Sequence, residues 1–168
     1  MQIFLIRHPR PLIDAGVCYG RLDIDCADAQ HVAARLRALL PEGTPVISSP
    51  LRRARQLAEA LDPQASIDAR LTEVDFGEWE GQTWNDIGRD ALDAWAADVF
   101  NFCPPGGESP ARLQQRAIDF AASLAGSRVA LVTHAGVMRA LVGHWRQLPL
   151  AEWTQLKFEF GSITEIEI

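Results

Sequence analysis

The sequence Ile3-Phe4-Leu5-Ile6-Arg7-His8 begins with four apolar residues and passes directly into an arginine and a histidine. A second stretch, Val129-Ala130-Leu131-Val132-Thr133-His134, has the same form near the other end of the chain. Short continuous apolar runs are typical of central strands in a parallel sheet that is covered on both faces. Each stretch therefore predicts a buried strand with a histidine at its carboxyl end.

Two further strands are predicted outside these stretches. Residues 45–47 form a shorter apolar run, and residues 163–168 alternate apolar and polar side chains, as in a half-exposed strand at or near a sheet edge. Apolar residues recur at helical spacing in five segments, 32–40, 50–61, 92–99, 110–124 and 137–148. Ser49-Pro50 and Ser109-Pro110 are typical helix starts. The alternation predicts a three-layer α/β fold, with a mostly parallel central sheet and helices on both faces.

The composition is that of an ordinary globular protein. The chain has 168 residues, 48% hydrophobic and 23% charged, which fits a single domain over residues 1–168. Sixteen Lys plus Arg residues against twenty-two Asp plus Glu residues give a net charge of −6, which argues against a nucleic-acid partner. No apolar run approaches the length that crosses a bilayer, so no membrane partner is expected. Whether the chain forms a homo-oligomer stays open.

The three cysteines, Cys18, Cys26 and Cys103, are far apart and have no Cys-x-x-Cys or paired-histidine spacing. This pattern argues against a disulfide framework and against a structural zinc site. The N-terminal apolar run is short and has no basic leader, so we expect no signal peptide and a cytoplasmic location.

Polar side chains follow three of the predicted strands at their carboxyl ends. Arg7-His8 and Thr133-His134 end two of them, and the strand at 45–47 leads into Ser48-Ser49 and then Arg52-Arg53. Ligands of open parallel sheets bind at this edge, and helix N-termini that begin there attract anions. Crowded cationic side chains repel one another unless an anion lies between them. The sequence therefore predicts an anion site, most simply for a phosphoryl group.

Two histidines at one phosphoryl group indicate chemistry as well as binding. A neutral imidazole can attack phosphorus and form a phosphohistidine, which divides one displacement into two easier steps. Neighbouring arginines would lower the pKa of His8 and neutralise charge on the phosphoryl oxygens in the transition state. The leaving oxygen needs a proton, which we expect from a carboxylic acid in the connection 62–90. Spacing alone does not choose among Glu73, Asp75, Glu78 and Glu80.

Four ordered motifs carry a resemblance to a known family. They are Leu-Ile-Arg-His at 5–8, Ser-Ser-Pro-Leu-Arg-Arg-Ala at 48–54, Leu-Thr-Glu-Val-Asp-Phe-Gly-Glu-Trp-Glu-Gly at 71–81 and Val-Thr-His-Ala-Gly-Val at 132–137. With these motifs, over nearly the whole chain, the sequence resembles the histidine phosphatase superfamily, which includes the cofactor-dependent phosphoglycerate mutases. Pro-Gly-Gly-Glu-Ser at 105–109 also resembles the family's stretch before its next helix.

The resemblance implies a phosphoglycerate mutase-like fold and a phosphomonoesterase that uses neither a metal nor another cofactor. At the matching positions, His8 is implied to be the phosphorylated nucleophile, with Arg7 and Arg53 binding the phosphate. Glu73 matches the acid/base carboxylate, and His134 matches the second histidine at the phosphoryl group. The chain is shorter than full-length mutases, which favours water as the phosphoryl acceptor.

The first motif departs from the family's usual Arg-His-Gly-Glu-Thr with an Asn shortly after it. Here Pro9 and Arg10 follow the histidine, and Asp14 stands at the Asn position. Pro9 has no N–H to donate to phosphate, Arg10 brings positive charge where the family has an acid, and Asp14 would repel an anion. These departures favour one alternative from a different class, a phosphate-binding regulator that has lost turnover.

Segments 16–23 and 75–84 resemble the subgroup of α-ribazole phosphatases, which remove the 5′-phosphate of α-ribazole phosphate during cobalamin nucleotide-loop assembly. This resemblance implies a phosphorylated small molecule as the substrate, with Tyr19 and Arg21 as substrate-binding residues. Tyr19 and a tryptophan at 79 or 84 offer a flat apolar surface for a benzimidazole ring, and core packing is their alternative role. Within the same chemistry, the alternatives are a broad-specificity phosphatase, a protein phosphatase and a mutase.

Overall fold

The computed structural model describes residues 1–168 and contains a five-stranded sheet in the order β3-β2-β4-β1-β5. The strands are β1 (Gln2–Arg7), β2 (Val46–Ser48), β3 (Ser66–Ile67), β4 (Arg128–Thr133) and β5 (Ile163–Glu167). β4 pairs in parallel with β1 and β2, β2 pairs in parallel with β3, and β5 runs antiparallel to β1 at the edge. The mostly parallel sheet and the edge position of the last strand are confirmed.

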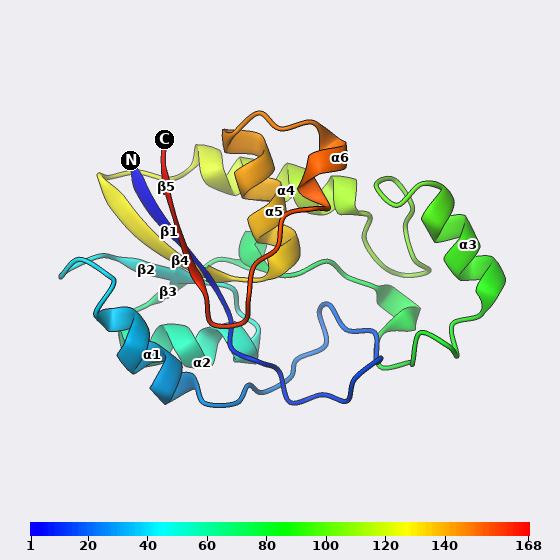
Figure 1. Cartoon of the computed structure of the whole chain (residues 1–168), viewed down its shortest axis with the longest axis horizontal. Coiled ribbons are helices and arrows are strands. Elements are labelled where there is room, and N and C mark those ends of the chain that lie inside the picture. Colours follow the sequence, from blue (N-terminus) through cyan, green and yellow to red (C-terminus); the bar gives the residue numbers. More distant parts are fainter.

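Helices cover both faces of this sheet (Figure 1). α1 (Ala29–Arg37) and α2 (Arg52–Leu61) lie on one face, and α4 (Pro110–Ala122), α5 (Ala135–Trp145) and α6 (Leu150–Trp153) lie on the other. Successive side chains of a strand point to opposite faces. Phe4 and Ile6 therefore pack with α1 and α2, whereas Ile3 and Leu5 pack with α4 and α5. The three-layer α/β fold is confirmed.

No helix combines the length and the apolar character that a membrane-spanning segment requires.

The two serine–proline pairs that predict helix starts behave differently. Ser109 caps α4, because its Oγ accepts a hydrogen bond from the Arg112 N–H and Pro110 is the first helical residue. The prediction is wrong for Ser49, because α2 begins at Arg52 and Leu51 stands at its cap position. The Ser49 hydroxyl lies 2.8 Å from Nε2 of His134 instead. Ser49, whose sequence is typical of a helix cap, therefore lies at the carboxyl edge of the sheet, next to His134.

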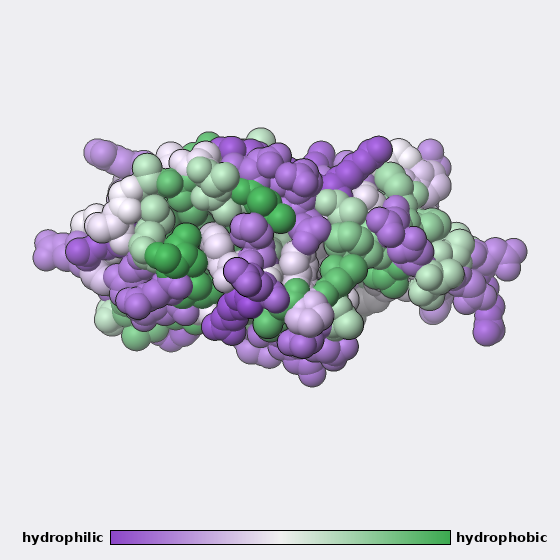
Figure 2. All heavy atoms as spheres, turned by 90° about the horizontal axis from the view of Figure 1, so that it is seen from above, coloured by the Kyte–Doolittle hydropathy of each residue, from purple (hydrophilic) through white to green (hydrophobic).

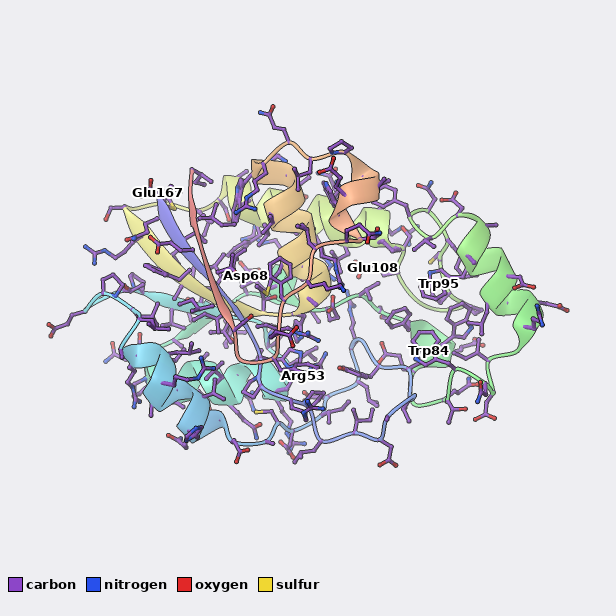
Figure 3. All side chains as sticks on the ribbon, in the orientation of Figure 1. Arg53, Asp68, Trp84, Trp95, Glu108 and Glu167 are labelled. Carbon is purple, nitrogen blue, oxygen red and sulfur yellow. The ribbon has the colours of Figure 1, made fainter.

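Residues 74–109, which we call the aromatic appendage, extend beside the sheet and include α3 (Arg89–Ala97) (Figure 1). Two short 3₁₀ helices, η1 (Ala69–Leu71) and η2 (Gly77–Trp79), lie before α3. α3 has no buried residue, so the helix predicted there exists but its apolar stripe does not enter the core. Trp84 stacks on Trp95 with ring centroids 5.7 Å apart (Figure 3). Aromatic contacts of its own therefore hold much of the appendage together.

Candidate active site

The two histidines that follow β1 and β4 lie together at the carboxyl edge of the sheet. β1 and β4 are parallel neighbours with Arg7 opposite Thr133, and the His8 N–H donates to the Thr133 carbonyl oxygen at 3.0 Å. The imidazole centroids of His8 and His134 are 5.0 Å apart. Their side chains are buried, with 2% and 0% of the residue exposed. Adjacent strand ends thus bring together two residues from opposite ends of the sequence.

The hydrogen bonding of His8 defines its tautomer. Nδ1 lies 2.6 Å from the carbonyl oxygen of Pro9, and because a carbonyl only accepts, Nδ1 carries the proton. Nε2 then keeps its lone pair. Burial, together with the positive charges of Arg53 and Arg7, lowers the pKa of His8 to about 3 against the opposing effect of the Pro9 contact. His8 is therefore neutral at physiological pH, with Nε2 available as a nucleophile.

His134 is neutral for the same reasons. Burial holds its pKa well below the usual value, with further lowering by His8 and Arg53. Its Nε2 bonds the Ser49 hydroxyl at 2.8 Å, and its buried Nδ1 has no partner within the protein. The sequence places Ser49 both at the carboxyl end of a strand and at a predicted helix start, and the structure bears out only the first of these.

Two arginines complete the cationic part of the site. Arg53 is 0% exposed and donates to the carbonyl oxygens of Gly20 at 2.5 Å and Leu22 at 2.8 Å. Arg7 donates to the Phe158 carbonyl oxygen at 2.6 Å. Burial lowers the pKa of both guanidinium groups below their usual value. The buried Nε atoms of both arginines lack a partner in the protein, and buried donors of this kind are normally hydrogen-bonded. An anion with several oxygens would supply acceptors for them.

Phe160 forms an apolar wall beside these charges that the sequence gave no reason to expect. The Arg7 guanidinium carbon lies 3.7 Å from the centre of its ring, in the geometry of a cation–π contact. The ring centroid is 5.5 Å from that of His8. The exposed Arg10 also lies over this ring, with its guanidinium carbon at 5.6 Å. Phe160 therefore contacts the nucleophile candidate and two cations at once.

Of the four acids considered in the connection 62–90, Glu73 is the one whose carboxylate lies at the start of α5. Its Oε2 accepts from the Gly136 N–H at 3.0 Å and its Oε1 from the Val74 N–H at 3.1 Å. A Cβ at position 136 would lie 2.2 Å from Oε1, so only glycine leaves room for this contact. Gly136 follows His134 by two residues, so the carboxylate lies at the first turn of the helix that begins after His134.

The other three acids of the connection have different surroundings. Asp75 accepts from the Gly77 N–H at 2.8 Å, and Glu78 is exposed. Glu80 accepts from the Arg21 N–H at 2.7 Å and from the N–H groups of Phe76 and Leu22. These contacts hold loop backbone in place, and none of them involves His8 or His134.

The predicted substrate-binding residues, Tyr19 and Arg21, point to different neighbours. The Tyr19 ring lies beside Arg53, with its centre 5.3 Å from the Arg53 guanidinium carbon. Burial raises the pKa of Tyr19. The Arg21 guanidinium pairs with Asp75 at 3.5 Å and with Glu108 at 3.6 Å. Tyr19 therefore faces the histidine site, whereas Arg21 belongs to a neighbouring ionic cluster.

Pro9 and Asp14, the two departures that argue against phosphate binding, have different surroundings in the structure. Pro9 is buried and contributes its carbonyl oxygen to His8 rather than an N–H to a ligand. Asp14 is exposed. No three side chains of His, Cys, Asp or Glu are grouped so as to hold a metal ion.

A cavity of about 530 Å³ opens between the aromatic appendage and helices α4, α5 and α6. Nine of its fifteen lining residues are hydrophobic, so it suits an apolar group better than a charged one. Val74 and Gly136 line it, and they are the chain neighbour of Glu73 and the N–H donor to its carboxylate. Figure 2, seen from above, shows apolar patches interrupted by hydrophilic residues on this side of the molecule. The cavity thus adjoins the carboxylate of the site.

Comparison with known proteins gives matches over nearly the whole chain. The sequence model of the histidine phosphatase superfamily (branch 1) matches residues 3–168. The glucosyl-3-phosphoglycerate phosphatase of Mycolicibacterium vanbaalenii is 31% identical, over 92% of this chain and 78% of its own length. The adenosylcobalamin/α-ribazole phosphatase of Salmonella typhimurium is 26% identical, over 100% and 91%. The solved native structure of a mycobacterial glucosyl-3-phosphoglycerate phosphatase has a TM-score of 0.84 at 28% identity, covering 98% of this chain and 88% of that one.

Proposed function

The chain belongs to the histidine phosphatase superfamily and is a metal-independent phosphatase, and from this premise we propose that it hydrolyses small-molecule phosphate monoesters through a phosphohistidine on His8. The observation that carries the proposal is the pair of buried, neutral imidazoles, 5.0 Å apart, between two arginines. A structural histidine pair has no need of two neighbouring guanidinium groups, one buried and one half-buried, whereas a phosphoryl group uses both.

In the first step, the lone pair on His8 Nε2 attacks phosphorus, so that the N–P bond forms and the bond from phosphorus to the ester oxygen breaks. Glu73 gives its proton to the departing oxygen, which leaves as an alcohol. Arg7 and Arg53 offset the negative charge on the phosphoryl oxygens as the transition state forms.

In the second step, the Glu73 carboxylate removes a proton from water as the water oxygen attacks phosphorus. The N–P bond breaks, inorganic phosphate leaves, and the lone pair returns to His8 Nε2. The Pro9 carbonyl oxygen accepts from Nδ1, so the attacking nitrogen is Nε2 in every cycle. Ester and water are thereby converted to alcohol and phosphate with each residue restored.

The proposed physiological substrate is α-ribazole 5′-phosphate. Tyr19, whose ring lies near the phosphate-pocket arginine, and the mostly hydrophobic cavity beside Glu73 both suit a phosphate ester with a flat, apolar ring. The relative from Salmonella typhimurium, which carries this substrate in its name, aligns with the whole chain.

A sugar phosphoglycerate is the second candidate substrate. The greater identity of the glucosyl-3-phosphoglycerate phosphatase favours it. The exposed Arg10 at the Phe160 ring also favours it, because a cation there would attract a carboxylate close to the phosphate.

A rate comparison tests the substrate proposal. We would measure kcat/KM for α-ribazole 5′-phosphate, glucosyl-3-phosphoglycerate, phosphoserine, common sugar and nucleotide monophosphates and a phosphopeptide. The proposal predicts that α-ribazole 5′-phosphate exceeds the others by at least about tenfold, the discrimination that a fitted pocket supplies. A faster reaction with glucosyl-3-phosphoglycerate would replace it with the second candidate. Isomerisation of phosphoglycerate without phosphate release would indicate a mutase, and binding without turnover would indicate a regulator.

The proposed acid is tested by the leaving group. Glu73→Gln should slow hydrolysis of an alkyl phosphate by about a hundredfold or more. It should slow p-nitrophenyl phosphate far less, because that leaving group departs without a proton. Equal losses on the two substrates would remove Glu73 from the acid role.

A further inference from the structure

We propose that Arg116 is a positioning residue for Glu73, an inference that rests on the proposed role of Glu73 as the acid. Arg116 lies on α4, and its side chain is 17% exposed. Its Nη1 donates to the carbonyl oxygens of Arg70 at 2.7 Å and Thr72 at 2.6 Å. Its Nη2 donates to the carbonyl oxygen of Glu73 itself at 3.1 Å. One guanidinium thus binds three carbonyls of the segment that carries the acid.

Glu108, labelled in Figure 3, binds the same guanidinium with its carboxylate. Its two carboxylate oxygens accept from Nε and Nη2 of Arg116, each at 2.8 Å, and Glu108 is 9% exposed. A two-point contact of this kind fixes the plane of an arginine as well as its position. Glu108 belongs to the Pro-Gly-Gly-Glu-Ser motif at 105–109, which the reaction steps do not use. In this arrangement the motif serves to orient Arg116.

Two other contacts tie the same segment to the histidine end of β4. Thr133 Oγ1 donates to the Leu71 carbonyl oxygen at 2.7 Å, and the Glu73 carboxylate accepts from the Gly136 N–H at 3.0 Å. Between these two contacts, Arg116 donates the hydrogen bond to the backbone carbonyl oxygen of Glu73. Without it, the Thr72 and Glu73 carbonyls lose their hydrogen bonds, and acceptors left without a partner favour a shift of the segment.

The effect on the reaction follows from the geometry that proton transfer requires. A displacement of about 1 Å in a reacting group can lower the rate by about a hundredfold. Arg116 touches the backbone of Glu73 and not its carboxylate, so a change at position 116 moves the acid without changing its chemical nature. Its variants should therefore imitate Glu73→Gln in kind, and more weakly.

The test compares the full chain with Arg116→Met, which keeps a long side chain but loses its donors. The readout is the ratio of kcat on an alkyl phosphate to kcat on p-nitrophenyl phosphate, which reports the proton donor and cancels general losses. We expect this ratio to fall by about tenfold to a hundredfold. Arg116→Lys keeps the charge and one set of donors, and it should restore part of the ratio. Arg112→Met, an exposed arginine on the same helix, is the matched control and should leave the ratio unchanged.

A folded Arg116→Met protein that loses equal activity on both substrates, or none, would overturn the inference. The double variant with Glu73→Gln sharpens the result: if Arg116 acts through Glu73, its ratio equals that of Glu73→Gln alone, and a further fall contradicts the inference. If Glu73→Gln alone leaves the ratio unchanged, the proposed function fails instead. Should Arg116→Met not fold, Arg116→Lys and Glu108→Gln decide the question by the same ratio.

Discussion

The proposed phosphate pocket, formed by Arg7, His8, Arg53 and His134, and the aromatic appendage are held in different ways. His8, Arg53 and His134 are at most 2% exposed and lie at strand ends or in the first turn of a helix that packs on the sheet. In the appendage, α3 has no buried residue, and Trp84 and Trp95 stack away from Arg53 (Figure 3). The sheet core therefore fixes the pocket, whereas aromatic contacts near the surface hold the appendage.

This difference suggests how the two regions divide their work. The distance between the imidazoles depends on the pairing of β1 with β4, which cannot change without disturbing the core. Residues 97–100, at the end of α3 in the appendage, line the apolar cavity beside Glu73, so a change there alters what the cavity accepts and leaves the histidines in place. We therefore assign the chemistry to the pocket and expect substrate selectivity to come from the appendage.

The largest effect is expected from the nucleophile. His8→Asn should lower turnover by at least about a thousandfold on every substrate, because no other group can form the covalent intermediate. Steady-state kinetics on p-nitrophenyl phosphate measures this loss, with the thermal midpoint as a control for folding. A folded variant that keeps a tenth of the wild-type rate would place the nucleophile elsewhere.

A smaller but still large effect is expected at Arg53. Arg53→Lys keeps the charge but loses the planar fork that contacts both Gly20 and Leu22, so kcat/KM should fall by about a hundredfold. Arg52→Lys is the matched control, because Arg52 is exposed and pairs with Asp25 on the surface. Similar losses in the two variants would mean that the buried guanidinium has no special role.

The buried histidines should also make stability depend on pH. Burial lowers the pKa of His8 to about 3 and holds that of His134 well below its usual value, whereas both take up protons near pH 6.5 when the chain unfolds. The unfolded state thus binds more protons between about pH 3 and 6.5, so stability decreases as the pH is lowered through that window, by up to about 1.4 kcal/mol per pH unit for each imidazole. Urea unfolding between about pH 4 and 8 measures this slope. His8→Asn should make it shallower, and an unchanged slope would argue against a neutral buried His8.

Removing the stack in the appendage should have a weaker effect. Trp95→Ala should lower the free energy of unfolding by about 1 kcal/mol, the contribution of an aromatic pair. It should leave kcat on p-nitrophenyl phosphate within about twofold, because distant sites act independently. The ratio of kcat/KM values among bulky substrates is expected to change more than kcat on p-nitrophenyl phosphate. A collapse of p-nitrophenyl phosphate turnover in a folded variant would mean that the two regions are coupled.

The smallest effect is expected from chelation. A phosphatase that works through histidine and arginine needs no metal, so EDTA should leave the rate unchanged. Vanadate, which mimics five-coordinate phosphorus, should inhibit strongly at the same site. A rate that falls in EDTA and returns with a divalent cation would contradict the metal-free chemistry.

The sheet and most of the helices could be predicted because each has a pattern of its own. The apolar runs at 3–6 and 129–132 indicate central strands, and the alternation at 163–168 indicates an edge strand, as β5 confirms. β3 has only two residues and α6 only four. Elements so short depend on their neighbours and leave no period in the sequence.

The part of the site that lies at strand ends could be predicted from the sequence. The part that depends on contacts between loops could not. His8 and His134 follow strands, so a parallel sheet alone is enough to bring them together. Ser49 carried a stronger cap signal than site signal, and Phe160 comes from a connection with no pattern. Spacing alone left four acids open and the family resemblance pointed to Glu73, whose carboxylate the structure brings against Gly136, a contact that only a glycine allows.

The most direct measurement of the central claim is to trap the phosphoryl enzyme. Wild-type protein is mixed with a radiolabelled phosphate monoester, quenched in alkali within one turnover, digested and mapped by mass spectrometry. We predict label on the peptide that contains residue 8, stable in alkali and lost in acid, and none on the His8→Asn protein. Label on His134, or phosphate release with no labelled protein at any quench time, would contradict it.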